Sequence, residues 1–244
     1  MDISLAAGLL AIIFIAYLIR GITGFGSGLI AVPLLAHFQP LTFVVPFVMT
    51  LDLSAALLLG GYDKRKIRWQ EIRPVIPATL VGVVLGVTLL VNLPREPLLT
   101  ALAIFVIIFG IRNLLNLHGN SPISTLWAYP TGFAGGLIGA LFNTGGPPYV
   151  IYFSHRIHDK SAFRATLSGI FLLDSGMRLL MFLLAGLFWQ THLLSALLVA
   201  APVMALGLYL GHRVHVGISQ AHLLMLVGAL LIGSGGSLLW KAWG

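Results

Sequence analysis

Residues 132–148 read GFAGGLIGALFNTGGPP and continue directly into the apolar segment YVIYF at 149–153. A second glycine-rich stretch that ends in proline, GITGFGSGLIAVP, occupies residues 21–33. Both stretches lie inside long apolar tracts, so a helix that they interrupt would be interrupted at membrane depth. A broken backbone persists there only where protein or a water-filled cavity satisfies its N–H and C=O groups. A matched pair of such breaks is the sequence feature that best indicates the binding site of a secondary transporter.

The composition is that of an integral membrane protein. Of the 244 residues, 58% are hydrophobic and 9% are charged, and the mean hydropathy is +1.00, whereas soluble domains carry about 25% charged residues. The absence of cysteine excludes disulfides and cysteine-based metal sites. The net charge of +7 is better explained by positively charged cytoplasmic loops than by nucleic-acid binding. We therefore expect a single membrane domain and no nucleic-acid partner.

Apolar tracts and basic loops predict how the chain crosses the bilayer. Two long tracts, 3–37 and 126–154, carry the breaks. Six more tracts have about the length of a spanning helix, and they lie at 41–61, 72–92, 97–117, 161–187, 193–212 and 222–242. Segments 62–73 and 154–164 hold five and three Lys or Arg residues, so both should face the cytoplasm. The connection at 189–192 has none and should face outward.

This orientation makes each broken tract a hairpin. The spans at 72–92 and 97–117 return the chain to the cytoplasm, so tract 126–154 must begin and end on that side. Its 29 residues are fewer than the roughly 40 that two full spans need, which predicts two half-helices meeting at 143–148. The same reasoning makes tract 3–37 a hairpin that opens to the outside.

The predicted fold is an all-α integral membrane protein with two inverted repeats. Residues 1–118 would form the first transmembrane repeat and residues 119–244 the second, each a re-entrant hairpin followed by three transmembrane helices. In the alternative interpretation each broken tract is one long span, which gives eight spans and two parallel repeats.

The stretch GITGFGSGLIAVPLL at 21–35 resembles the first motif of the TauE/SafE family of membrane transporters, and the stretch at 132–148 resembles its second. The resemblance implies a secondary transporter that exports sulfite or small organosulfonate anions across the bacterial inner membrane by alternating access. An anion channel, or a transporter of another small anion, stays open as an alternative. We expect no enzyme activity and no cofactor, because the sequence has no catalytic constellation and no Walker A pattern. The expected partners are a small anion and the lipid bilayer, and a homo-oligomer is compatible with the sequence.

The anion site is expected at the two breaks, because the N-terminus of a helix attracts anions. Glycine permits close approach of the backbone, and hydroxyl, amide and guanidinium groups add hydrogen-bond donors. The predicted substrate-binding residues are Arg20, Gly24, Gly26, Ser27, Gly28, Asn143, Thr144, Gly145 and Gly146. The alternatives are close helix packing through small residues and, for Arg20, a side chain that reaches to the membrane interface.

Two acidic residues, Asp52 and Asp174, occupy corresponding places after the two breaks. Either acid could carry a coupling proton, and a structural hydrogen-bonding role is the alternative. Arg178 lies four residues after Asp174, on the same helix face, where the two side chains should form a structural ion pair. Contact of this pair with the substrate is the alternative. The histidines have no carboxylate-rich set beside them, so no metal site is predicted.

Overall fold

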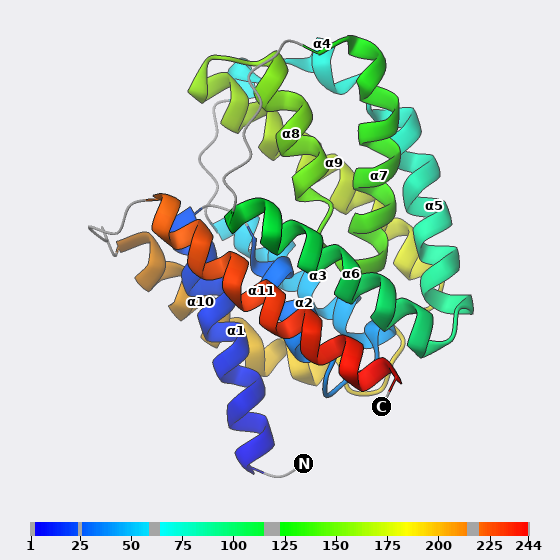
Figure 1. Cartoon of the computed structure of the whole chain (residues 1–244), viewed down its shortest axis with the longest axis vertical. Coiled ribbons are helices and arrows are strands. Elements are labelled where there is room, and N and C mark those ends of the chain that lie inside the picture. The colour runs from blue at the N-terminus through cyan, green and yellow to red at the C-terminus, as the bar shows by residue number, and fades with distance from the viewer. Residues whose placement is uncertain (1–2, 24–25, 59–63, 115–122, 214–219, 244) are drawn as a thin grey trace. The chain divides into compact units, whose positions relative to one another are not determined.

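The computed structural model is built from helices throughout the residues that it describes, which are 3–23, 26–58, 64–114, 123–213 and 220–243 (Figure 1). No strand occurs among them, so the prediction of an all-α protein is confirmed. The six uninterrupted tracts correspond to α3 (Leu41–Leu58), α5 (Ile76–Asn92), α6 (Arg95–Leu114), α9 (Lys160–Leu184), α10 (Leu193–Arg213) and α11 (Gln220–Trp243). Short helical turns lie at η1 (Lys64–Lys66), α4 (Trp69–Ile72) and η2 (Thr125–Trp127).

Both predicted breaks are present. The first separates α1 (Ile3–Thr23) from α2 (Ser27–Leu35), and the second separates α7 (Ala128–Phe142) from α8 (Gly146–Arg156). Left-handed backbone ends or begins a helix at each break, with φ of 96° at Gly26 and 53° at Asn143. Glycine and asparagine are the residues that adopt this conformation most readily. Two prolines then occupy the first turn of α8, where a missing N–H breaks no intrahelical bond.

Four of the described helices are long and apolar enough to cross a bilayer: α1 through its window Ala6–Thr23, α3, α9 and α10. The two broken tracts differ in this respect. With a rise of about 1.5 Å per residue, the 21 residues of α1 reach span length, whereas the 15 residues of α7 do not.

The chain divides into two compact units that are discontinuous in sequence. The first consists of Met1–Ala55, Leu93–Leu117 and Trp189–Gly244, and the second of Ala56–Asn92 and His118–Phe188. The first unit therefore contains α1, α2, α3, α6, α10 and α11, and the second contains α4, α5, α7, α8 and α9. Each unit takes helices from both sides of residue 118. The two units therefore do not coincide with the predicted repeats 1–118 and 119–244, and the division into those repeats stays a prediction.

In the first unit α1 packs closely against α10. A β-carbon on Gly211 would lie 2.1 Å from the carbonyl oxygen of Leu18, and one on Gly207 would lie 2.7 Å from that of Phe14. Residue numbers rise together along this contact, so the two helices are parallel. Helices α6 and α11 also run side by side (Figure 1), in opposite directions, since residue 110 meets residue 228 and residue 107 meets residue 235.

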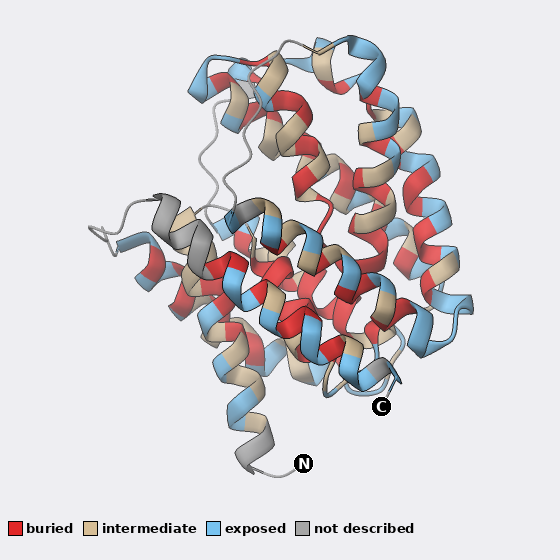
Figure 2. Ribbon diagram, viewed as in Figure 1, coloured by how far each residue is buried: buried red, intermediate tan, exposed pale blue. Residues whose placement is uncertain are grey.

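In the second unit α5 and α7 form a second parallel pair. A β-carbon on Gly136 would lie 2.3 Å from the carbonyl oxygen of Thr79, and one on Gly82 would lie 2.3 Å from that of Phe133. Much of α5 is coloured as exposed in Figure 2. Its exposed residues include apolar ones such as Val81, as a lipid-facing surface would.

Helices α7 and α8 fold back on each other. The ring of Tyr149, in the first turn of α8, lies against Gly135 in the middle of α7, where a β-carbon would be 2.4 Å from the ring carbon Cζ. Tyr149 also belongs to the apolar core of the second unit, together with Tyr152, Phe153 and Ile170.

The basic segments 62–73 and 154–164 meet at one end of the second unit. Arg156 donates to both carboxylate oxygens of Glu71 at 3.0 and 2.9 Å, and Lys66 Nζ donates to Ser161 Oγ at 3.1 Å. An uninterrupted span over 126–154 would place these segments on opposite sides of a membrane. The contacts therefore agree with a hairpin in this tract.

A labelling experiment tests the sidedness of these segments. Single cysteines at Arg65, Lys160 and Thr191, all exposed positions, can be offered an impermeant thiol reagent from outside the cell, and the native chain contains no cysteine that would interfere. We expect labelling at Thr191 and protection at Arg65 and Lys160 until the cells are permeabilised. Labelling of either basic segment in intact cells would overturn the orientation.

Candidate functional site

In the first unit, three donors converge on one carboxylate oxygen. Asp52 Oδ1 accepts hydrogen bonds from Tyr17 OH at 2.7 Å, from Ser27 Oγ at 2.6 Å and from Arg20 Nη1. We call these four residues the Asp52 cluster. They come from three helices, α1, α2 and α3.

The local structure explains why these side chains meet. Tyr17 and Arg20 are three residues apart on α1 and so share a face, with the Arg20 guanidinium carbon 5.9 Å from the centre of the Tyr17 ring. Arg20 also reaches across the break, because its Nη1 donates to Ser27 Oγ at 3.1 Å and its Nη2 to the Asp52 carbonyl oxygen at 3.2 Å. Arg20 is therefore bound within the protein and does not reach out to an interface.

The N-terminus of α2 lies next to this cluster. Its N-cap, Gly26, supplies no side-chain hydrogen bond, and the N–H groups of Ser27, Gly28 and Leu29 belong to the first turn, where a helix has no partner for them. These groups and the helix dipole place partial positive charge beside the guanidinium of Arg20. The Nε of Arg20 is buried and has no hydrogen-bond partner.

A related cluster lies in the second unit, and we call it the Asp174 cluster. Arg178 Nη2 lies 2.9 Å from Asp174 Oδ2, so the ion pair expected from the spacing is present. Tyr149 OH donates to Asp174 Oδ1 at 3.5 Å. Arg178 Nη1 donates to Asn143 Oδ1 at 2.6 Å and to the Gly139 carbonyl oxygen at 2.9 Å, so the guanidinium also closes the carbonyl end of α7.

The two clusters differ in accessibility. The side chains of Arg20 and Asp52 are 13% and 19% exposed, whereas those of Arg178 and Asp174 are 7% and 1% exposed. Arg178 also donates to three acceptors besides the Asp174 carboxylate, which are the Gly139 carbonyl oxygen, Asn143 Oδ1 and Ser175 Oγ. Arg20 donates to two besides the Asp52 carboxylate, Ser27 Oγ and the Asp52 carbonyl oxygen. The Asp52 cluster is thus the better candidate for a site where a ligand replaces a hydrogen-bond partner. The Asp174 cluster has the features of a structural ion pair.

Known proteins identify the family. The family model for the sulfite exporter TauE/SafE matches residues 9–238. The chain belongs to the TauE/SafE family. It is 29% identical over 201 residues to the probable inner membrane transporter protein TsaS of Comamonas testosteroni, which covers 80% of this chain and 82% of that protein. It is also 29% identical over 250 residues to the probable sulfite/organosulfonate exporter TauE of Cupriavidus necator, covering 96% and 94% of the two chains. No solved structure matches.

Membership makes this protein a membrane transporter, and an exporter family implies a small anion as substrate. The candidate residues of this TauE/SafE protein fall into two groups. Arg20, Gly26, Ser27 and Gly28 lie at the break of the first unit, and Asn143, Thr144, Gly145 and Gly146 lie at the break of the second. Gly24 lies outside the described residues.

The second break offers fewer donors to an anion than the first. Pro147 and Pro148 follow Gly146 in the first turn of α8 and have no N–H groups. Gly145 packs against α7, because a β-carbon there would lie 2.3 Å from the Gly135 carbonyl oxygen. Thr144 keeps a free group, since its hydroxyl oxygen is buried and has no hydrogen-bond partner.

Sequence reasoning missed Tyr17 and Tyr149, although the Tyr17 hydroxyl donates to Asp52 and the Tyr149 hydroxyl to Asp174. The spacing of Tyr17 three residues before Arg20 was an available signal. Within the described part of the chain no group of three or more His, Asp or Glu residues could hold a metal. His155 Nδ1 instead lies 2.7 Å from the Ile151 carbonyl oxygen, and His215 lies outside the described residues.

Proposed function

We propose that this TauE/SafE protein is a secondary transporter that exports sulfite or small organosulfonate anions across the bacterial inner membrane by alternating access. The anion binds at the Asp52 cluster. The observation that carries this proposal is the convergence of Tyr17, Ser27 and Arg20 on a single anionic oxygen. An oxygen of sulfite or of a sulfonate carries negative charge, as a carboxylate oxygen does, and accepts hydrogen bonds from the same kinds of donor.

The N-terminal turn of α2 would complete the site. The N–H groups of this turn lie next to Ser27 and stabilise negative charge without adding a formal charge to the membrane interior. The two relatives support the chemical class of the substrate, since one is named a probable sulfite/organosulfonate exporter and the other a probable inner membrane transporter.

The pattern of helix pairs supports two inverted repeats. If α1, α3, α5 and α6 correspond to α7, α9, α10 and α11, then the parallel pair of α1 with α10 corresponds to the parallel pair of α7 with α5. Helices α6 and α11 correspond to each other, and they also form a pair. Each half also places an acid, Asp52 or Asp174, on the helix that follows its broken hairpin. Such repeats provide the two related halves that alternating access uses.

Removal of the Arg20 charge tests the site. We expect Arg20→Gln to weaken binding of sulfite or of a small sulfonate by roughly ten- to a hundredfold, because a hydrogen bond to a charged group is worth about 1.5–3 kcal/mol. Titration calorimetry in detergent and counterflow of labelled substrate in proteoliposomes should both report the loss. Arg164→Gln removes an exposed arginine at the start of α9 and is the matched control.

If Arg20→Gln binds the anion as tightly as the wild-type protein does and melts at the same temperature, the anion does not bind at this cluster. Counterflow also separates a carrier from a channel. A carrier accumulates labelled substrate against an unlabelled internal pool, whereas a channel would give single-channel currents in a planar bilayer.

A further inference from the structure

We infer that Asp52 is an internal competitor of the transported anion, and that each anion enters the site together with one proton that neutralises Asp52. This inference rests on the proposed function. It assigns the coupling ion and the residue that carries it.

The geometry shows the competition. Without a substrate, the carboxylate of Asp52 occupies the position of an anionic oxygen and takes the hydrogen bonds of Tyr17, Ser27 and Arg20. Arg20 Nη1 donates to the Asp52 carboxylate and Nη2 to the Asp52 backbone carbonyl oxygen, so the carboxylate holds the first of these two nitrogens. An incoming anion can use these donors only if the carboxylate releases them.

The charges explain why a proton is needed. Among the described residues that donate hydrogen bonds to Asp52, the titratable groups are Tyr17 and Arg20, both from α1, and the residue from α2 is the uncharged Ser27. With Asp52 ionised and Arg20 protonated, the ion pair has no net charge. An anion added alone would leave one uncompensated negative charge in a largely buried site, which is costly.

A proton restores the balance. The proton binds to the Asp52 carboxylate as this group releases its donors, and the anion takes its place as the partner of the Arg20 guanidinium. The site then again has no net charge, and one negative charge is paired with Arg20 in each state. Because the anion and the proton move together, transport is electroneutral, and the membrane potential does no work on it. Net export then follows the combined concentration gradients of the anion and the proton.

The Asp174 cluster lacks this arrangement. After protonation of Asp174, Arg178 would keep three acceptors, the Gly139 carbonyl oxygen, Asn143 Oδ1 and Ser175 Oγ. Arg20 would keep two after protonation of Asp52, Ser27 Oγ and the Asp52 carbonyl oxygen. The side chain of Asp174 is also 1% exposed, compared with 19% for Asp52. The exchange is therefore assigned to Asp52.

Calorimetry can count the proton. Methanesulfonate is a suitable probe, because a sulfonate stays ionised at every pH at which the protein is stable. Titration of the purified protein in two buffers with different heats of ionisation should show uptake of about one proton per anion. Wherever binding takes up a proton, the affinity for methanesulfonate should fall by up to about tenfold for each unit by which the pH rises.

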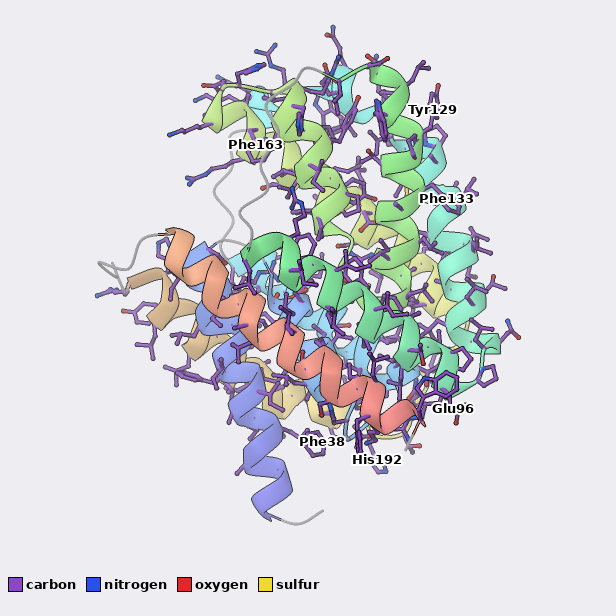
Figure 3. All side chains as sticks on the ribbon, viewed as in Figure 1. Phe38, Glu96, Tyr129, Phe133, Phe163 and His192 are labelled. Atoms are coloured by element: carbon purple, nitrogen blue, oxygen red, sulfur yellow. The ribbon has the colours of Figure 1, made fainter. Side chains whose placement is uncertain are left out.

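Variants assign the proton to a residue. We expect Asp52→Asn to bind methanesulfonate without proton uptake and with an affinity that does not change with pH. Glu96→Gln removes an exposed acid at the start of α6 (Figure 3) and should keep the uptake of the wild-type protein. Full proton uptake by Asp52→Asn would overturn the assignment to Asp52.

Measurement of proton uptake by the wild-type protein tests the inference even if Asp52→Asn does not fold. Binding of methanesulfonate without proton uptake would overturn the inference and leave the proposed transporter intact, whereas no binding of methanesulfonate or sulfite at any pH would overturn both. Proteoliposomes give a second measurement. Net efflux of labelled methanesulfonate into substrate-free medium should proceed at the same rate with and without a potassium diffusion potential. A rate that follows the potential would contradict coupled movement of one proton.

Discussion

Gly136→Ala is expected to prevent stable folding of the second unit. The added β-carbon would lie 2.3 Å from the carbonyl oxygen of Thr79, which is a backbone atom of α5 and cannot rotate away. Relief of the clash would separate α5 from α7 and also loosen their other close contacts, such as Gly82 against Phe133. Overpacking of a core costs about 1–3 kcal/mol where side chains can adjust, and here the contact is with backbone, so we expect a loss beyond that range. Thermal unfolding in detergent and the yield of monodisperse protein measure it.

Gly176→Ala is the matched control. Gly176 also lies inside a long helix of the second unit, α9, but no atom is within 4 Å of the position of its β-carbon. Alanine there should leave the melting temperature unchanged or raise it, since alanine favours a helix over glycine by about 1 kcal/mol. Equal melting temperatures for the two variants would show that α5 and α7 do not approach as closely as described.

The glycines at 132–148 show what the sequence alone could and could not predict about the candidate site. A glycine run inside an apolar tract fits either a ligand site or close helix packing, and both interpretations apply to different residues of one run. Gly136 and Gly145 are closed off by backbone atoms of neighbouring helices. A β-carbon on Gly146 would make only an ordinary contact with the Phe171 ring, at 3.6 Å. Composition cannot separate these cases, because the difference lies in what another helix places opposite each residue.

Local features were predictable and pairings were not. The breaks and the helix ends follow from Gly, Pro and hydropathy, which act over a few residues, and the ion pair of Asp174 with Arg178 follows from their spacing on one helix. The pairing of α1 with α10 and of α5 with α7 could not be predicted from the spacing of apolar residues along these helices. In a helix that is apolar on every side, the lipid-facing and protein-facing residues are chemically alike. Tyr149 was missed for the same reason, whereas the spacing of Tyr17 from Arg20 was a local signal.

The Asp174 cluster provides the second large effect. Arg178→Gln would leave the Asp174 carboxylate, 1% exposed, without its ion-pair partner, and would remove the guanidinium donor from Asn143 Oδ1 and from the Gly139 carbonyl oxygen. Removal of one member of a buried pair costs about 3–5 kcal/mol in soluble proteins, and we expect a loss of that size in the unfolding free energy of this protein. Thermal or denaturant unfolding in detergent, followed by circular dichroism, measures the change.

The double variant Asp174→Asn with Arg178→Gln separates the two possible roles of this pair. It removes both charges, so no unpaired ion stays buried, and it should be more stable than Arg178→Gln alone. A structural pair predicts this recovery, together with anion binding that is close to that of the wild-type protein. If Arg178→Gln instead melts like the wild-type protein and loses anion binding, then Arg178 contacts the substrate. The anion site would in that case belong to the second break, where the unpartnered hydroxyl of Thr144 lies next to Asn143, and the Asp52 cluster would be the structural one of the two.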